Sequence, residues 1–203
     1  MENKAHPSHL VLVISVLLLT GAAGPAVNSQ ENEKALKIER YQNEPLQLVE
    51  IRIGDQSVNA ELATKPIVTS ERLDTITFKQ TAGWYRHLEI RLRNVSGKLI
   101  NGIRASLYFH PVHTEAIFSV PFSAFSPSGN GILEPGAETA LIITEHAWIL
   151  SEDILKRHLV DPEQSPAFFG LATVSFDRSL EWSKGQMLRR DPDNPNRWTV
   201  IPN

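Results

Sequence analysis

Two stretches of the chain alternate strictly between apolar and polar side chains. They are residues 87–93, with the sequence HLEIRLR, and residues 103–109, with the sequence IRASLYF. A period of two residues is that of a β-strand with one buried and one solvent-facing side. Asn94, Ser96 and Gly97 lie between the two stretches and favour a chain reversal. The pattern therefore predicts an antiparallel β-hairpin.

Short strand-like runs continue along the rest of the chain. We expect strands at residues 46–53, 57–63, 74–79, 117–124, 137–145 and 167–176. Turns rich in proline and glycine separate them, as in residues 126–131 (SPSGNG) and 134–136 (EPG). Strands at this spacing favour a β-sandwich or barrel over a βαβ fold.

A single short helix is expected at Ser151–Leu159. Ser151 is a suitable N-cap, and Lys156 and Arg157 lie in the last turn, where positive charge is favourable. Pro162 then prevents the helix from continuing. The predicted fold class is therefore all-β, a single antiparallel β-sandwich with one short peripheral helix.

The N-terminal residues 1–29 have the three-part layout of a secretory signal peptide. A polar stretch, Met1–His9, precedes the apolar run Leu10–Leu19, and small residues follow it. We expect cleavage after Ala26 or Ser29, and an exported protein that is periplasmic or extracellular. The alternative is an uncleaved membrane anchor, although the apolar run is shorter than the roughly 20 residues that span a bilayer core. Membrane contact is expected only in that case.

Composition limits the classes of function. The chain has 203 residues and a net charge of −3, and its Lys and Arg residues do not cluster, so nucleic-acid binding is not expected. Cysteine is absent, which excludes disulfides and cysteine-ligated zinc. The polar residues 30–43 are predicted to form a flexible leader. Residues 44–203 are then the β-sandwich domain.

The region around the predicted hairpin resembles a known family. Its motifs combine a strand, a turn and the entry into a later strand: Leu88-x-Ile90-x-Leu92, Asn94-x-Ser96-Gly97-Lys98 and Leu133-x-Pro135-Gly136. Over about residues 85–145 they are similar to FxLYD-type immunoglobulin-like β-sandwich domains of uncharacterised secreted bacterial proteins. The resemblance implies an immunoglobulin-like sandwich, and it implies no reaction, cofactor or ligand.

A histidine-rich loop is one candidate site. His110, His113 and Glu115 carry imidazole and carboxylate groups, which are ligands for zinc and copper. On an extended segment the odd spacing of the two histidines sends their rings to opposite faces, so a turn at Pro111 would be needed to bring them together. Exposed loop histidines are the expected state, and a divalent-metal-binding module is the alternative.

The C-terminal region contains a candidate interaction patch of aromatic and basic side chains. Its members are Trp182, Arg189, Arg190, Arg197 and Trp198. Such groups suit a glycan or protein partner. Aromatic residues also fill the cores of β-sandwiches, so a structural role for the tryptophans is the alternative.

No residue pattern identifies a reaction. The Gly-x-Ser-x-Gly motif of a nucleophile elbow is absent. We therefore expect a non-enzymatic exported protein without a cofactor, with a binding or envelope-associated interaction role. Its partner would be an unknown protein or glycan of the cell envelope. A hydrolase acting on envelope polymers is the enzymatic alternative, and it would need paired carboxylates in a cleft.

Overall fold

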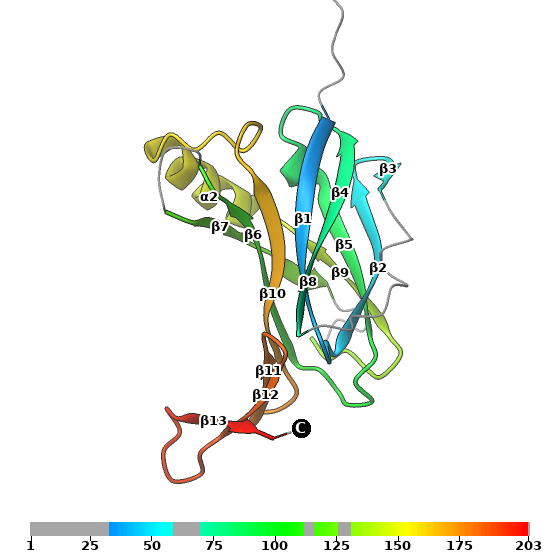
Figure 1. Ribbon diagram of the computed structural model, residues 1–203, viewed down its shortest axis with the longest axis vertical. Helices are drawn as coiled ribbons and strands as arrows, with labels where there is room; N and C mark the ends of the chain where they lie inside the picture. The colour runs from blue at the N-terminus through cyan, green and yellow to red at the C-terminus, as the bar shows by residue number, and fades with distance from the viewer. Residues whose placement is uncertain (1–32, 59–69, 112–115, 126–130, 203) are drawn as a thin grey trace, which may run out of the picture. The chain divides into compact units, whose positions relative to one another are not determined.

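The computed structural model describes residues 33–58, 70–111, 116–125 and 131–202. The predicted signal peptide, residues 1–29, lies outside this part of the chain. The described residues form two β-sheets, one α-helix and one short 3-10 helix (Figure 1). Among them, no helix is both long and apolar enough to cross a membrane.

The larger sheet has eight strands. Its path runs β13-β12-β11-β10-β1-β4, and β6 joins this path by pairing with β10 and also pairs with β7. All of these pairings are antiparallel except that of β1 with β10. The strands are β1 (Glu33–Tyr41), β4 (Glu71–Lys79), β6 (Gly102–Phe109), β7 (Phe118–Pro121), β10 (Ala167–Ser175), β11 (Leu180–Ser183), β12 (Gln186–Arg190) and β13 (Trp198–Ile201).

The smaller sheet has five antiparallel strands in the order β3-β2-β5-β9-β8. They are β2 (Leu46–Ile53), β3 (Gln56–Ser57), β5 (Leu88–Asn94), β8 (Ser123–Phe125) and β9 (Glu138–Ile142). The strand predicted at 46–53 coincides with β2, and the strand predicted at 117–124 is divided between β7 and β8. Most of the strand predicted at 57–63 lies outside the described residues.

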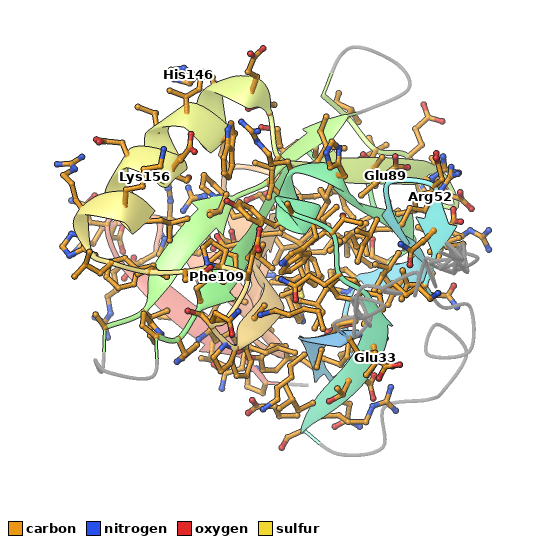
Figure 2. All side chains as sticks on the ribbon, turned by 90° about the horizontal axis from the view of Figure 1, so that it is seen from above. Glu33, Arg52, Glu89, Phe109, His146 and Lys156 are labelled. Atoms are coloured by element: carbon orange, nitrogen blue, oxygen red, sulfur yellow. The ribbon has the colours of Figure 1, made fainter. Side chains whose placement is uncertain are left out.

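The inner faces of the two sheets share one apolar core. Trp84, in the 3-10 helix η1 (Trp84–His87), lies within this core, with its ring centroid 5.0 Å from that of Phe78 and 6.4 Å from that of Phe109. Figure 2 shows Phe109 in the interior. Two sheets around a common core are the architecture of a β-sandwich. The prediction of a mostly β chain with one peripheral helix is confirmed at this level.

The predicted hairpin between residues 87–93 and 103–109 is wrong. β5 pairs with β2 and β9 in the smaller sheet, whereas β6 pairs with β10 and β7 in the larger one. The chain crosses between the sheets after the buried Asn94, whose Nδ2 donates to the carbonyl oxygens of Lys98 and Leu133. Alternation predicted both strands, but a pattern within one strand carries no information about its partner.

The predicted flexible leader at residues 30–43 is also wrong. β1 occupies most of it and lies within the larger sheet, between β4 and β10. Leu36 and Ile38 point into the core and are 0% and 1% exposed. The sandwich therefore includes β1 and does not begin at residue 44.

Two charged side chains of β1 also face inward. Lys34 is buried, and its Nζ donates to the carbonyl oxygens of Glu163 at 3.0 Å and Ser165 at 2.6 Å. Arg40 is buried as well and pairs with Glu44 at 2.8 Å. Buried charges are tolerated where such partners replace water.

The helix α2 (Glu145–Arg157) begins earlier than predicted. Thr144 is its N-cap, and Thr144 Oγ1 accepts a hydrogen bond from Ala147 N at 3.3 Å. Ser151, the predicted cap, is buried within the helix. The earlier start brings Trp148 into contact with Tyr85, with their ring centroids 4.8 Å apart.

One edge of β10 is shared between two partners. β6 follows the other edge along its whole length, so β1 and β11 must share this one. β1 pairs with residues 167–169 and β11 with residues 173–175. A register shift between Leu171 and Thr173 lies where β10 changes partner. The C-terminal strands are thus attached to the far half of β10.

Candidate functional site

The predicted metal site lies only partly within the described residues. The ring of His110 packs against Phe168 with their centroids 4.7 Å apart, and Lys37 Nζ lies 5.0 Å from the centre of the same Phe168 ring. His113 and Glu115 lie outside the described residues. Within the described ranges, no three His, Cys, Asp or Glu side chains are placed to hold a metal ion. A metal site at His110, His113 and Glu115 therefore stays a prediction.

The predicted interaction patch does not form a single surface. Trp182 is 0% exposed and packs edge-on against Tyr41, with their ring centroids 6.0 Å apart. Its assignment to a contact surface is therefore wrong, since a fully buried ring fills the core instead. Arg189, Arg190 and Trp198 lie on β12 and β13, and Arg197 directly precedes β13.

β11, β12 and β13 form an antiparallel unit, here named the C-terminal ribbon (residues 180–201), drawn in orange to red in Figure 1. Lys184 and Gly185 join β11 to β12 with positive φ values of 46° and 84°, as in a type I′ hairpin turn. The cross-strand pairs place Trp182 beside Met187 and Met187 beside Ile201. This face of the ribbon is directed towards the core, against which Met187 packs.

The opposite side of the ribbon, named its outer face, includes Leu188, Arg190, Trp198 and Val200, and Glu181 of β11 lies beside Leu188 on the same side. Leu188 pairs with Val200 and Arg190 with Trp198, so all four point to the same side. The guanidinium carbon of Arg190 lies 5.0 Å from the centre of the Trp198 ring. Val200 is 55% exposed. The outer face therefore combines apolar area with a cation.

β13 also has an unpaired edge among the described strands. Asp191 and Arg197 continue the pairing of β12 with β13 by one residue pair. Asp191 N donates to Arg197 O at 2.9 Å, so this pair is a hydrogen-bonded one. In an antiparallel ladder every second residue bonds to the partner strand. Thr199 and Ile201 therefore face β12, whereas the main-chain groups of Trp198 and Val200 point to the open edge.

The three arginines of the ribbon, Arg189, Arg190 and Arg197, are not ion-paired within the described part of the chain. Asp191 lies at the ribbon tip, but its Oδ1 accepts hydrogen bonds from the main-chain nitrogens of Asp193 and Asn194 at 2.9 and 3.3 Å. This carboxylate holds the loop closed.

A second candidate site is a cleft of about 340 Å³ between η1, α2 and the turn that follows α2. Its lining comes from three separate parts of the sequence: Ala82, Gly83, Tyr85, Arg86, His87, Trp148, Glu152, Asp161, Pro162 and Glu163. Sequence reasoning missed it because no single segment contains a recognisable motif. The only sequence signal is the presence of aromatic residues in two of the three segments.

The aromatic wall of the cleft is formed by Tyr85 and Trp148. Arg86 lies over this wall, with its guanidinium carbon 3.9 Å from the centre of the Trp148 ring. Tyr85 is only 6% exposed, and its hydroxyl has no hydrogen-bond partner in the described part of the chain. Burial, and next the Glu152 carboxylate, raise the pKa of Tyr85 to about 12. The hydroxyl is therefore a neutral donor at the cleft.

Three carboxylates form the rim of the cleft. Glu163 Oε1 accepts a hydrogen bond from Gly83 N at 3.1 Å, which joins the turn after α2 to η1. Asp161 Oδ1 accepts one from Glu163 N at 2.9 Å. Glu152 pairs with Lys156, which Figure 2 shows on α2, at 2.9 Å. The rim is thus fixed by local bonds and remains acidic.

Comparisons with known proteins found no relative. No family model, no curated protein and no solved structure matches this chain.

Proposed function

We propose that this protein is a non-enzymatic, exported binding protein whose C-terminal ribbon recognises an extended segment of a partner protein in the cell envelope. The observation that supports this most is the unpaired edge of β13, which lies beside the half-buried Trp198 and the exposed Val200. A peptide can add to such an edge as a further strand, with main-chain hydrogen bonds for affinity and side-chain contacts for specificity. Unprotected apolar edges are otherwise avoided because they promote aggregation.

The charges of the ribbon favour an acidic partner over a second copy of the chain. Two copies joined along β13 would bring their arginine-rich ribbons together, and like charges at an interface oppose association. A partner strand with Asp or Glu beside its apolar positions would instead neutralise Arg190 and Arg197. The expected ligand is therefore an extended acidic and apolar segment.

The wider assignments are proposals of the same kind. An immunoglobulin-like sandwich is supported by two sheets around one core and by the crossing from β5 to β6, which joins the two sheets. Export is supported by the three-part pattern of residues 1–29. The absence of a recognisable catalytic motif in the sequence supports a binding role.

Site-specific photo-crosslinking in the native host tests the ribbon. A benzophenone amino acid at position 198 should crosslink to an envelope protein, and the same group at the exposed Glu33 of β1 should not. Mass spectrometry should map the crosslink to an acidic segment. A crosslinked homodimer, or the same products from both positions, would contradict the proposal.

A synthetic peptide of the mapped segment then allows a main-chain test. Val200→Pro removes an N–H that points to the open edge and leaves the bonds between β12 and β13 in place. We expect it to abolish peptide binding while the circular dichroism spectrum stays unchanged. Thr199→Ala is the matched control, because it alters the same strand without removing a main-chain donor. Equal binding by all three proteins would refute strand addition.

A further inference from the structure

We propose that the cleft between η1 and α2 binds an organic cation, namely a primary ammonium or guanidinium group on an apolar stem. A lysine or arginine side chain of a peptide has this chemistry. The site is separate from the ribbon, because none of the residues that line it lies within residues 180–201. The inference does not depend on the function proposed for the ribbon.

The charges of the cleft select a cation. Its lining contains the carboxylates of Glu152, Asp161 and Glu163 against the single guanidinium of Arg86. Asp161 and Glu163 make no ion pair among the described residues. An anion would therefore meet unneutralised carboxylates, whereas an ammonium group could donate hydrogen bonds to them.

Lys156 pairs with Glu152 of this rim, and Lys34 is a further cation nearby. Lys34 makes no ion pair with the other two carboxylates, Asp161 and Glu163. Burial lowers the pKa of Lys34, and the carboxylates of Asp161 and Glu163 oppose this shift, so their charges are within electrostatic reach. However, Lys34 Nζ donates to the main-chain oxygens of Glu163 and Ser165. The side-chain carboxylates thus remain available to a ligand.

The aromatic wall supplies the second, independent indication. A cation over the face of a tryptophan is favourable, and more so where water is partly excluded. Arg86 already occupies the face of Trp148, which demonstrates that a planar cation fits there. The buried Tyr85 adds a hydroxyl that has no partner within the described residues and lies at the cleft. Arg86 would then act as an internal competitor for the ligand.

Calorimetric titration of the full protein with agmatine, which carries both an ammonium and a guanidinium group, tests this inference. Arg86 is exposed, so Arg86→Ala should fold normally. Removing the competing cation should strengthen agmatine binding by about tenfold. Asp161→Asn should weaken it by about fivefold, since one carboxylate is lost. Arg197→Ala, which removes an exposed arginine of the ribbon, is the control and should bind as the wild type does.

Inorganic phosphate is the opposing probe. If phosphate binds and Arg86→Ala abolishes that binding, the cleft is an anion site and the proposal is overturned. It is also overturned if Arg86→Ala weakens agmatine binding, or if agmatine binds none of the variants. Thermal melts of each variant confirm that the comparison is made between folded proteins.

Discussion

Replacing Leu36 by alanine tests the finding that β1 is an integral strand of the sandwich. Leu36 is 0% exposed and lies opposite Ala167 on β10 and Ile76 on β4. The substitution removes three carbon atoms from a site closed on both sides. At about 0.8 kcal/mol per buried methylene group, the transfer term alone is roughly 2.4 kcal/mol. The cavity that remains brings the expected loss of unfolding free energy to about 3–4 kcal/mol.

Urea denaturation followed by tryptophan fluorescence measures this loss. With an m-value of about 2 kcal/mol per molar urea, the midpoint should fall by roughly 1.5–2 M while m stays constant. Glu33→Ala, an exposed position on the same strand, is the control and should change the stability by less than about 0.5 kcal/mol. If Leu36→Ala is equally mild, β1 contributes nothing to the core and its placement in the sheet is refuted.

Three further outcomes are expected. Burial lowers the pKa of Lys34 in the folded protein below 10.5. As the pH rises towards 10.5, the folded protein releases this proton before the unfolded chain does. Urea titrations should therefore show that the wild type gains stability relative to Lys34→Met over this pH range. Burial raises the pKa of Tyr85 from 10.0 to about 12. Between these pH values the wild type should lose up to about 2.7 kcal/mol of stability relative to Tyr85→Phe. A difference between the two proteins that does not depend on pH would contradict this. Intact mass spectrometry of the protein from its native host should find a species cleaved after Ala26 or Ser29, and a full-length species in the membrane fraction would instead indicate an anchor.

The strands were predictable where one face is apolar at every second position. β5 and β6 meet this condition, and both were located from the sequence. β1 does not, because the inward positions of Lys34 and Arg40 carry charges and only Leu36 and Ile38 between them are apolar. Arg40 has a local partner in Glu44, but the partners of Lys34 are the main-chain oxygens of Glu163 and Ser165, which a local pattern cannot reveal.

The candidate sites were predictable to different degrees for a related reason. Arg190 and Trp198 are close in sequence, and the hairpin of β12 and β13 pairs them, whereas Arg189 lies on the other face of the strand. Trp182 is an aromatic residue of the same region, yet it is buried. Which side of a strand faces the core depends on the register of its pairing, and the sequence of the strand does not give that register. The cleft joins three segments that are distant in sequence, so it emerges only from the tertiary fold.

The parallel pairing of β1 with β10 has a consequence for the kinetics of folding. The hydrogen bond from Lys34 to Ser165 joins residues 131 positions apart. Contacts of such long range form slowly, because the entropy of closing a large loop is lost before the contacts are gained. During synthesis, the edge of β1 that pairs with β10 stays unpaired until residues 167–169 have been made. The nascent chain should therefore stay unfolded for longer than one built from local hairpins.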